Sequence, residues 1–76
     1  MAELLAYLAR ELVDDPDAVR VDAEERDGAL VLRLHVAPDD IGKVSGRGGR
    51  IVRALRTVVR ASAVREGRRV LVEIAD

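Results

Sequence analysis

Apolar residues recur along this chain with two different periods, and each change of period marks the boundary of a predicted element. From residue 2 to residue 14, apolar side chains follow the helical spacing of three and four residues. They are Leu4, Leu5, Leu8, Leu12 and Val13. An acidic turn that contains Pro16 follows, and the residue before a proline disfavours the α-helical region. The pattern therefore predicts a helix over residues 2–14 that stops at this turn.

Two stretches with a period of two come next and predict strands. Small apolar residues alternate with charged ones from Val19 to Glu24, as in a half-buried strand. Asp27-Gly28 then signals a two-residue hairpin turn. Beyond this turn, the apolar residues at even positions from 30 to 36 share one face, while Arg33 and His35 lie on the other. This second stretch carries the clearest strand pattern of the chain.

The second half of the chain returns to the helical period before it ends in a strand. Pro38-Asp39-Asp40 ends the second strand and offers an N-cap for a short helix that runs to about Val44. A longer helix is expected from about Arg50 to Val64, with Gly67 suited to cap its C-terminus. The alternation from residue 70 to residue 74 predicts a last strand.

The predicted order of elements is α-β-β-α-α-β. Mixed in this way, with one hairpin, the elements indicate an α+β domain of two layers, in which helices pack on one face of a three-stranded sheet. A length of 76 residues leaves no room for a second domain, so residues 1–76 are expected to form one domain. The chain is 49% hydrophobic and 36% charged, which is typical of a globular rather than a disordered protein.

The composition also bears on where the protein works. The first residues lack the basic and unbroken apolar stretches of a secretion signal, and no apolar run is long enough to span a membrane. Cysteine is absent, which is compatible with a reducing compartment. We therefore expect a cytoplasmic protein that does not associate with membranes.

Charge is divided unevenly between the two halves of the chain. Residues 1–40 hold four basic and eleven acidic side chains, a net charge of −7, whereas residues 41–76 hold nine basic and three acidic side chains, a net charge of +6. Such a division fits a basic face in the second half that attracts an anionic partner. It equally fits two solvated halves that neutralise each other.

The predicted long helix is amphipathic, with a broad apolar arc. The arc contains Ile51, Val52, Leu55, Val58, Val59 and Ser62. Arg53, Arg56 and Arg60 cluster on the opposite side, where they form either a solvated surface or part of a binding face. The arc is wider than one small sheet covers, which favours an exposed apolar strip on this helix.

The candidate site is the glycine loop Gly46-Arg47-Gly48-Gly49, which opens onto the long helix. Glycine lets the backbone turn through positive φ and approach another molecule closely. The N-terminus of a helix leaves N–H donors without partners beside the positive end of the helix dipole. Lys43 and Arg50 flank this point in the sequence. The combination predicts a site for an anion, most simply a phosphate.

Other chemistries lack the residues that they need. The glycine segment matches neither the nucleotide-triphosphate loop nor the dinucleotide fingerprint. His35 is the only histidine and Ser45 has no adjacent base, so neither a metal site nor a nucleophilic triad is indicated. The acid pairs Asp14-Asp15 and Asp39-Asp40 are explained better by helix capping than by catalysis. We expect no enzyme activity, no metal and no cofactor.

Nucleic-acid binding is compatible with these residues, but not through stacking on aromatic platforms. Tyr7 is the only aromatic residue and lies in the acidic half. RRM, cold-shock and OB-type domains stack bases on Phe, Tyr or Trp, so these classes are disfavoured. A binder of this composition has to clamp the backbone and seat the bases against an aliphatic groove.

These features together resemble a known family. The segment Ile41 to Ile51 resembles the KH motif, in which a GxxG loop joins two helices and clamps about four nucleotides. Here the GxxG loop is Gly46-Arg47-Gly48-Gly49, and the order of elements resembles that of a type II, or bacterial, KH domain. Over essentially the whole chain, the sequence resembles the KhpA family of small bacterial single-KH proteins, most clearly at residues 13–17, 36–44, 50–59 and 70–76.

The resemblance implies binding of single-stranded RNA, in the role of a small RNA chaperone or regulator. Loop donors and three cations are expected to meet phosphates, while aliphatic residues and the strand around residues 31–35 flank the bases. The expected contact residues are Ile41, Lys43, Val44, Gly46, Arg47, Gly48, Gly49, Arg50 and Ile51. One position departs from the usual motif, because Ser45 stands where KH motifs commonly carry an aliphatic residue.

A protein-interaction module is the alternative function. Relatives in the KhpA family are associated with self-pairing and with pairing to KhpB, a larger RNA-binding protein that also carries a KH domain. The resemblance therefore also implies a homodimer, a complex with a KhpB-like protein, or both, with RNA binding weak or secondary. The broad apolar arc of the long helix is the sequence feature that favours this alternative.

Overall fold

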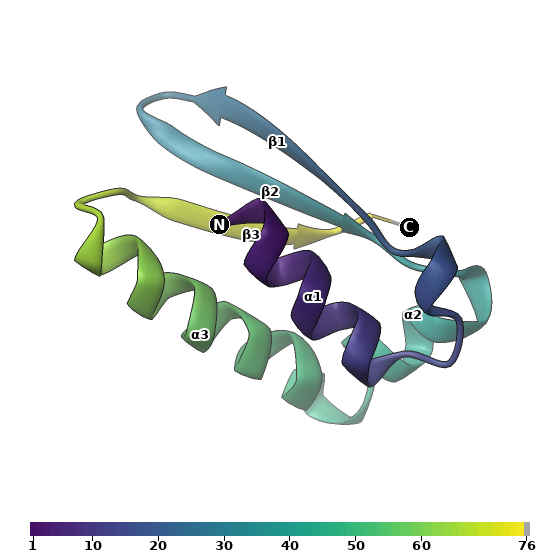
Figure 1. Ribbon diagram of the computed structural model, residues 1–76. Coiled ribbons are helices and arrows are strands. Elements are labelled where there is room, and N and C mark those ends of the chain that lie inside the picture. The colour runs from purple at the N-terminus through teal and green to yellow at the C-terminus, as the bar shows by residue number, and fades with distance from the viewer. Residues whose placement is uncertain (76) are drawn as a thin grey trace.

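A computed structural model of the chain describes residues 1–75, apart from the side chain of Arg47, and contains the six predicted elements in the predicted order (Figure 1). The helices are α1 (Ala2–Leu12), α2 (Pro38–Ser45) and α3 (Arg50–Arg65), and the strands are β1 (Arg20–Arg26), β2 (Ala29–His35) and β3 (Val70–Ile74). Short 3₁₀ turns occupy Pro16–Ala18 and Arg47–Gly49. The boundaries agree with the predictions to within a few residues.

The three strands form one sheet in the order β1-β2-β3. β1 and β2 are antiparallel across the Asp27-Gly28 turn, whereas β2 and β3 are parallel, with Leu30 opposite Val70. The helices lie on one side of the sheet, and the other side is open to solvent (Figure 1). The prediction of a two-layer α+β fold with helices on one sheet face is confirmed.

The core lies between the sheet and the helices. Its largest fully buried apolar side chains are Leu5, Leu32, Leu34, Val44 and Val59, which come from α1, β2, α2 and α3. Burial of each such side chain contributes roughly 1.5–3 kcal/mol relative to its exposure. Both helices that flank the glycine loop are therefore held to the same core as the central strand.

The first helix ends two residues earlier than its apolar pattern predicts, at Leu12 rather than at residue 14. Val13 is already extended, with φ −102° and ψ 164°. The backbone N–H groups of Asp14 and Asp15 donate to the carboxylate of Asp40, each at 3.1 Å, instead of to the preceding turn of α1. The hydrogen bonds to the distant Asp40 carboxylate therefore end the helix before the chain reaches Pro16.

The interpretation of Asp40 as a cap of its own helix is wrong. Ala37 is the N-cap of α2, Pro38 occupies the first helical turn, and no side chain caps this end within the described residues. Asp40 lies in the first turn with only 1% of its surface exposed, and its two carboxylate oxygens are both occupied by the α1–β1 connection. A buried carboxylate therefore ties α2 to the segment that follows α1.

The end of α3 follows the prediction. Gly67 adopts φ +69°, its N–H donates to Val64 O at 3.1 Å, and the N–H of Arg68 donates to Ala63 O at 2.9 Å. These two bonds form a Schellman motif, which uses carbonyl groups that the helix end leaves without partners. The chain then enters β3 directly.

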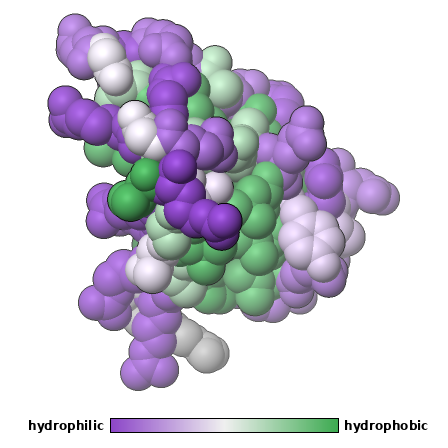
Figure 2. Space-filling view, turned by 60° about the vertical axis from the view of Figure 1, so that its left-hand side comes forward, coloured by the Kyte–Doolittle hydropathy of each residue, from purple (hydrophilic) through white to green (hydrophobic). Residues whose placement is uncertain are grey.

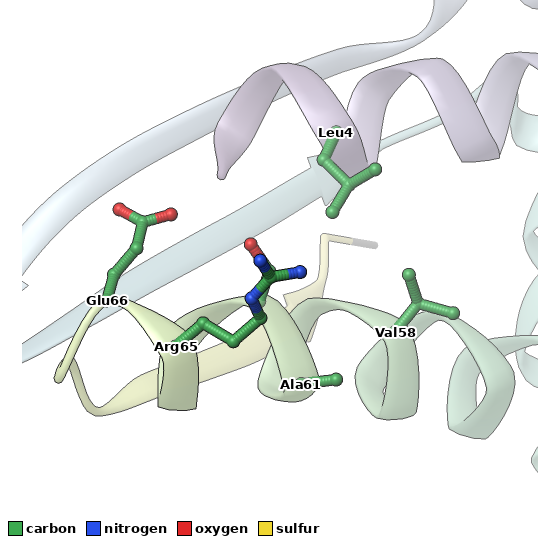
Figure 3. A pocket seen from close by; sticks show the side chains of 6 residues that line it. Leu4, Val58, Ala61, Arg65 and Glu66 are labelled. Carbon is green, nitrogen blue, oxygen red and sulfur yellow. The ribbon is translucent and has the colours of Figure 1, made fainter.

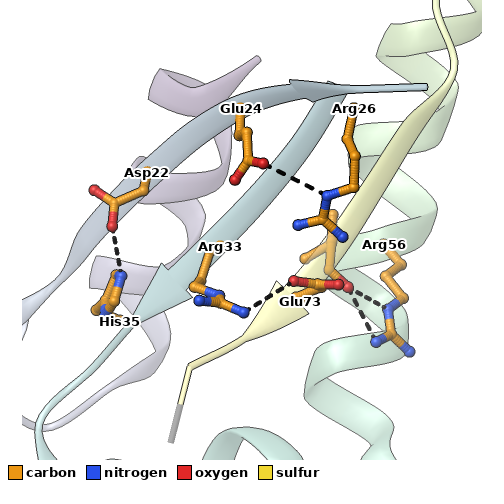
Figure 4. Close-up of polar contacts among 8 residues, drawn as sticks. Asp22, Glu24, Arg26, Arg33, His35, Arg56 and Glu73 are labelled. Carbon is orange, nitrogen blue, oxygen red and sulfur yellow. Dashed lines mark hydrogen bonds and ion pairs between the residues drawn. The ribbon is translucent and has the colours of Figure 1, made fainter. Parts of the chain in front are cut away.

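The open face of the sheet carries charged side chains in pairs (Figure 4). His35 Nε2 lies 2.8 Å from Asp22 Oδ2, and Arg33 Nη2 lies 3.5 Å from Glu73 Oε1. Val31 shares this face but is only 3% exposed. Strand neighbours and charged side chains therefore cover Val31.

Candidate functional site

The glycine loop leaves the last turn of α2 through a close backbone contact. A Cβ atom built on Gly46 would lie 2.2 Å from the carbonyl oxygen of Gly42, which no side chain tolerates. The dihedral angles of Gly46, φ −84° and ψ −174°, are open to any residue. The contact with Gly42, and not the backbone angle, therefore requires glycine at this first position of the loop.

The last two glycines of the loop are required by their backbone angles. Gly48 and Gly49 both have φ +72°, in the left-handed region that disfavours side chains. A Cβ atom on Gly48 would meet nothing within 4 Å, so the cost of a side chain there is one of strain alone. The turn that they make delivers the chain directly into α3.

Two of the loop donors are already used inside the protein. The N–H of Gly46 donates to Gly42 O at 2.7 Å, and the N–H of Gly49 donates to Gly46 O at 2.9 Å. α3 begins without a side-chain cap in the described part of the chain, and a helix start leaves its first N–H groups without intrahelical partners. The donors that remain for a ligand therefore include those at the start of α3, at Arg50 and Ile51, but not those of every loop glycine.

The three predicted cations differ in their surroundings. Lys43 Nζ lies 3.0 Å from Asp14 Oδ1, so this ammonium is paired with the end of the α1 connection. Arg50 is exposed at the first position of α3. The backbone of Arg47 lies in the loop, but its side chain is outside the part of the chain that the structure describes.

The aliphatic residues predicted to line a groove are not equivalent. Ile41 and Ile51 are half-buried, at α2 and at the start of α3, and keep some surface for a ligand. Val44 is fully buried and anchors α2 to the core instead of facing outward. The hydroxyl of Ser45 is exposed and donates to Ile41 O at 2.7 Å, which satisfies it within α2.

The strand beside α3 is β3, whereas β2 is separated from this flank. The expectation that residues 31–35 of β2 flank the bases stays a prediction. β2 is the central strand, and neighbours on both sides use its backbone groups. At β3, Arg56 of α3 donates from Nε and Nη2 to the carbonyl oxygen of Val72, at 3.2 and 3.1 Å (Figure 4). Arg56 is therefore not simply a solvated side chain, and the sequence pattern, which grouped it with Arg53 and Arg60, gave no signal of this contact.

A hollow of about 530 Å³ lies on the other flank of α3, between this helix and α1 (Figure 3). It is lined by Leu4, Val58, Ala61, Ser62, Arg65 and Glu66. Val58 is 44% exposed, so part of the predicted apolar arc is uncovered. Figure 2 shows apolar side chains gathered on one face of the molecule and surrounded by hydrophilic ones.

Two further findings concern other classes of site. Among residues 1–75, no group of three or more His, Cys, Asp or Glu side chains is arranged to hold a metal ion. No helix in the same range combines the length and the apolar character needed to cross a membrane.

Comparison with known families agrees with the order of elements. The family model described as "KhpA/KhpB, KH domain" matches residues 2–74. The chain belongs to this KhpA/KhpB KH-domain family. The resemblance found in the sequence is thereby confirmed, and the α-β-β-α-α-β arrangement on a three-stranded sheet is consistent with a KH domain.

Individual relatives within the KhpA/KhpB family match nearly from end to end. A protein of Clostridium acetobutylicum named RNA-binding protein KhpA is 50% identical over 74 residues, which cover 97% of this chain and 99% of the relative. A protein of the same name from Treponema pallidum is 50% identical, with 97% and 92% covered. The one from Aquifex aeolicus is 42% identical over 76 residues, with 100% and 96% covered.

Proposed function

We propose that this protein binds single-stranded RNA, with a phosphate at the start of α3 and the glycine loop folded beneath it. The observation that carries the proposal is the preformed turn at Gly48 and Gly49, which aims the first N–H groups of α3 outward. Relatives that match over nearly the whole chain are named RNA-binding protein KhpA, which supports the choice of RNA as the anion.

The cations around this point indicate the path of the RNA over the protein surface. Arg50 stands at the first position of α3, and Arg53, Arg56 and Arg60 continue along the same helix on the flank next to β3. A strand of RNA whose phosphate is held at the loop therefore passes between the basic flank of α3 and β3. The exposed parts of Ile41 and Ile51 border the phosphate site and supply aliphatic contacts for the bases.

Reversal of charge at the loop tests this site. Replacement of Arg47 and Gly48 by Asp introduces two negative charges where the phosphate is expected. We expect at least a tenfold loss of affinity for a fluorescently labelled single-stranded RNA in an anisotropy titration, with an unchanged circular dichroism spectrum. RNA affinity equal to that of the unsubstituted protein would overturn the proposed site.

The chain offers a matched control for strain at a left-handed glycine. Gly28 has φ +79° in the hairpin turn, and a Cβ atom there would meet nothing within 4 Å, as at Gly48. The Gly28→Asp variant therefore has the same kind of backbone strain and one added charge, away from the loop. We expect this variant to retain RNA affinity.

The salt dependence of RNA affinity measures how many cations contact phosphates. Each phosphate contact on a single strand contributes about −0.7 to the slope of log affinity against log salt concentration. Contacts from Lys43, Arg47 and Arg50 correspond to a slope of about −2. Backbone contacts of this kind suit the role of a small cytoplasmic RNA chaperone or regulator, which acts on many sequences rather than on one.

A second candidate function is self-association, or pairing with a larger KH-containing protein, through the hollow between α1 and α3. The exposed Val58 and the apolar lining favour it, because burial of this surface stabilises a complex. We expect sedimentation velocity at increasing concentration to detect a dimer, and Val58→Asp to shift the protein to monomer without loss of RNA affinity. Monomer at every concentration would remove self-association as a function.

A further inference from the structure

The two flanks of α3 differ in character. On one flank, Val58 and Ser62 line the hollow toward α1. At 100° per residue, Arg53, Arg56 and Arg60 fall together on the other flank, beyond the buried line of Val52, Leu55, Val59 and Ala63. The bond from Arg56 to Val72 O shows that this second flank borders β3.

β3 presents backbone groups to this flank. The N–H of Leu30 donates to Arg69 O, and the N–H of Ala75 donates to Leu34 O, so the odd-numbered residues of β3 point their backbone groups at β2. By the alternation of a strand, the backbone groups of Val70, Val72 and Ile74 point away from β2. β3 is an edge strand, so these groups form a row of donors and acceptors beside the arginines.

Arg56 differs from its two neighbours because its orientation is fixed. Nε and Nη2 donate together to one carbonyl oxygen, which orients the planar guanidinium along the edge of β3. The side chain is half-buried, and its other N–H groups remain for a ligand. The residue stands seven positions after Gly49, which is about 10 Å along the helix axis from the phosphate site.

We infer that Arg56 is a specificity-determining residue that selects an RNA base with two adjacent hydrogen-bond acceptors; this inference rests on the proposed RNA-binding function. Two parallel N–H groups of a guanidinium, its fork, match such a pair of acceptors, as in the contact of arginine with O6 and N7 of guanine. Cytosine offers O2 and N3 on its Watson–Crick edge in the same way. Adenine and uracil have no two adjacent acceptors on their Watson–Crick or Hoogsteen edges, so they cannot accept both N–H groups of the fork.

The test compares four labelled single-stranded RNAs in anisotropy titrations. One is oligoadenylate, and the others carry a single central guanine, cytosine or uracil. We expect the unsubstituted protein to bind the guanine or the cytosine oligonucleotide about tenfold more tightly than oligoadenylate. We expect Arg56→Lys, which keeps the charge and loses the fork, to abolish this preference. Whether guanine or cytosine is preferred identifies which acceptor pair is read.

Arg53→Lys is the matched control, since it makes the same change one turn earlier on the same flank, and we expect it to keep the preference. A merely structural role of Arg56 at the edge of β3 would lower thermal stability and would leave the ratio of affinities between oligonucleotides unchanged. An equal ratio in Arg56→Lys and the unsubstituted protein, or no preference in the latter, overturns the inference. Failure to bind any of the four RNAs overturns the proposed function itself and the inference with it.

Discussion

Lys43 and Asp14 form an ion pair of 3.0 Å that joins the helix before the glycine loop to the connection after α1. The ammonium group of Lys43, which is predicted from the sequence to contact phosphate, is therefore already paired with a carboxylate. An exposed pair of this kind contributes only about 0–1 kcal/mol, so phosphate can compete for the ammonium. At the proposed site, we therefore expect Asp14 to compete with RNA for Lys43.

Asp14→Asn should raise RNA affinity by roughly two- to fivefold at low salt, because it removes this competitor and releases Lys43. The gain should fade as salt is added, since screening weakens exposed charge interactions. Anisotropy titrations at two salt concentrations measure both effects. Asp17→Asn is the control, as it changes the net charge equally on the same connection; an equal gain in that variant would show a general charge effect instead of release of Lys43.

Asp40→Asn should destabilise the fold by about 1–3 kcal/mol, although the shape of the side chain is kept. Each carboxylate oxygen accepts a backbone N–H in the native protein, and an amide would oppose one of these donors with its own NH₂ group. Urea denaturation measures the change in the free energy of unfolding. The exposed neighbour Asp39, replaced in the same way, should show little effect, and a similar small effect at Asp40 would contradict the role given to its carboxylate.

Gly46→Ala should destabilise the protein, whereas Gly42→Ala, four residues earlier, should not. The new methyl group at 46 would lie 2.2 Å from Gly42 O, so α2 and the loop have to shift. At 42 it would meet nothing within 4 Å inside a helix, where Ala is preferred over Gly by about 0.5–1 kcal/mol. Thermal unfolding should therefore show a lower midpoint for the first variant and an unchanged or higher one for the second.

The pair of His35 and Asp22 on the open sheet face predicts a pH effect in the acid range. The hydrogen bond from His35, aided by the charge of Arg20, lowers the pKa of Asp22 below its ordinary value of 3.8. A carboxyl group with a lowered pKa stabilises the fold above its ordinary value, and that contribution is lost as the pH falls through the lowered pKa.

His35→Ala should therefore raise the pKa of Asp22 toward 3.8 and reduce the stabilisation that this carboxylate gives to the fold above that pH. An NMR titration of the side-chain carboxyl carbon measures the shift. Glu73→Gln, a change on the same face two strands away, should leave the pKa of Asp22 unaltered. No change in His35→Ala would assign the lowered value to Arg20 instead.

Local sequence patterns were enough to predict the helices, strands and turns, because nearby residues determine where these elements form. Period and turn chemistry identified the strands and the Asp27-Gly28 hairpin, and the positive φ of Gly67 follows from its place after an amphipathic helix. The glycine loop between two helices was likewise visible, since the angles of Gly48 and Gly49 demand glycine whatever surrounds them.

The contacts that shape the site depend on distant partners and were beyond such patterns. Asp40 looked like a cap of its own helix, but its partners lie 25 and 26 residues away. Arg56 was grouped with Arg53 and Arg60, as solvated surface or part of a binding face, because the order of the strands, and therefore the position of Val72, was unknown. Lys43 was assigned to phosphate because nothing in the sequence set Asp14 beside it.

The parallel pairing of β2 and β3 also governs when the site can form. Leu30 meets Val70 only after the whole crossover, with both helices and the glycine loop, has been closed, whereas β1 and β2 meet across a two-residue turn. Closure of a long loop is slower than closure of a short one. During synthesis the β1–β2 hairpin can therefore form early. The contact between β3 and α3 can form only once β3 has left the ribosome. The proposed site is therefore expected to be complete only after β3 has joined the sheet.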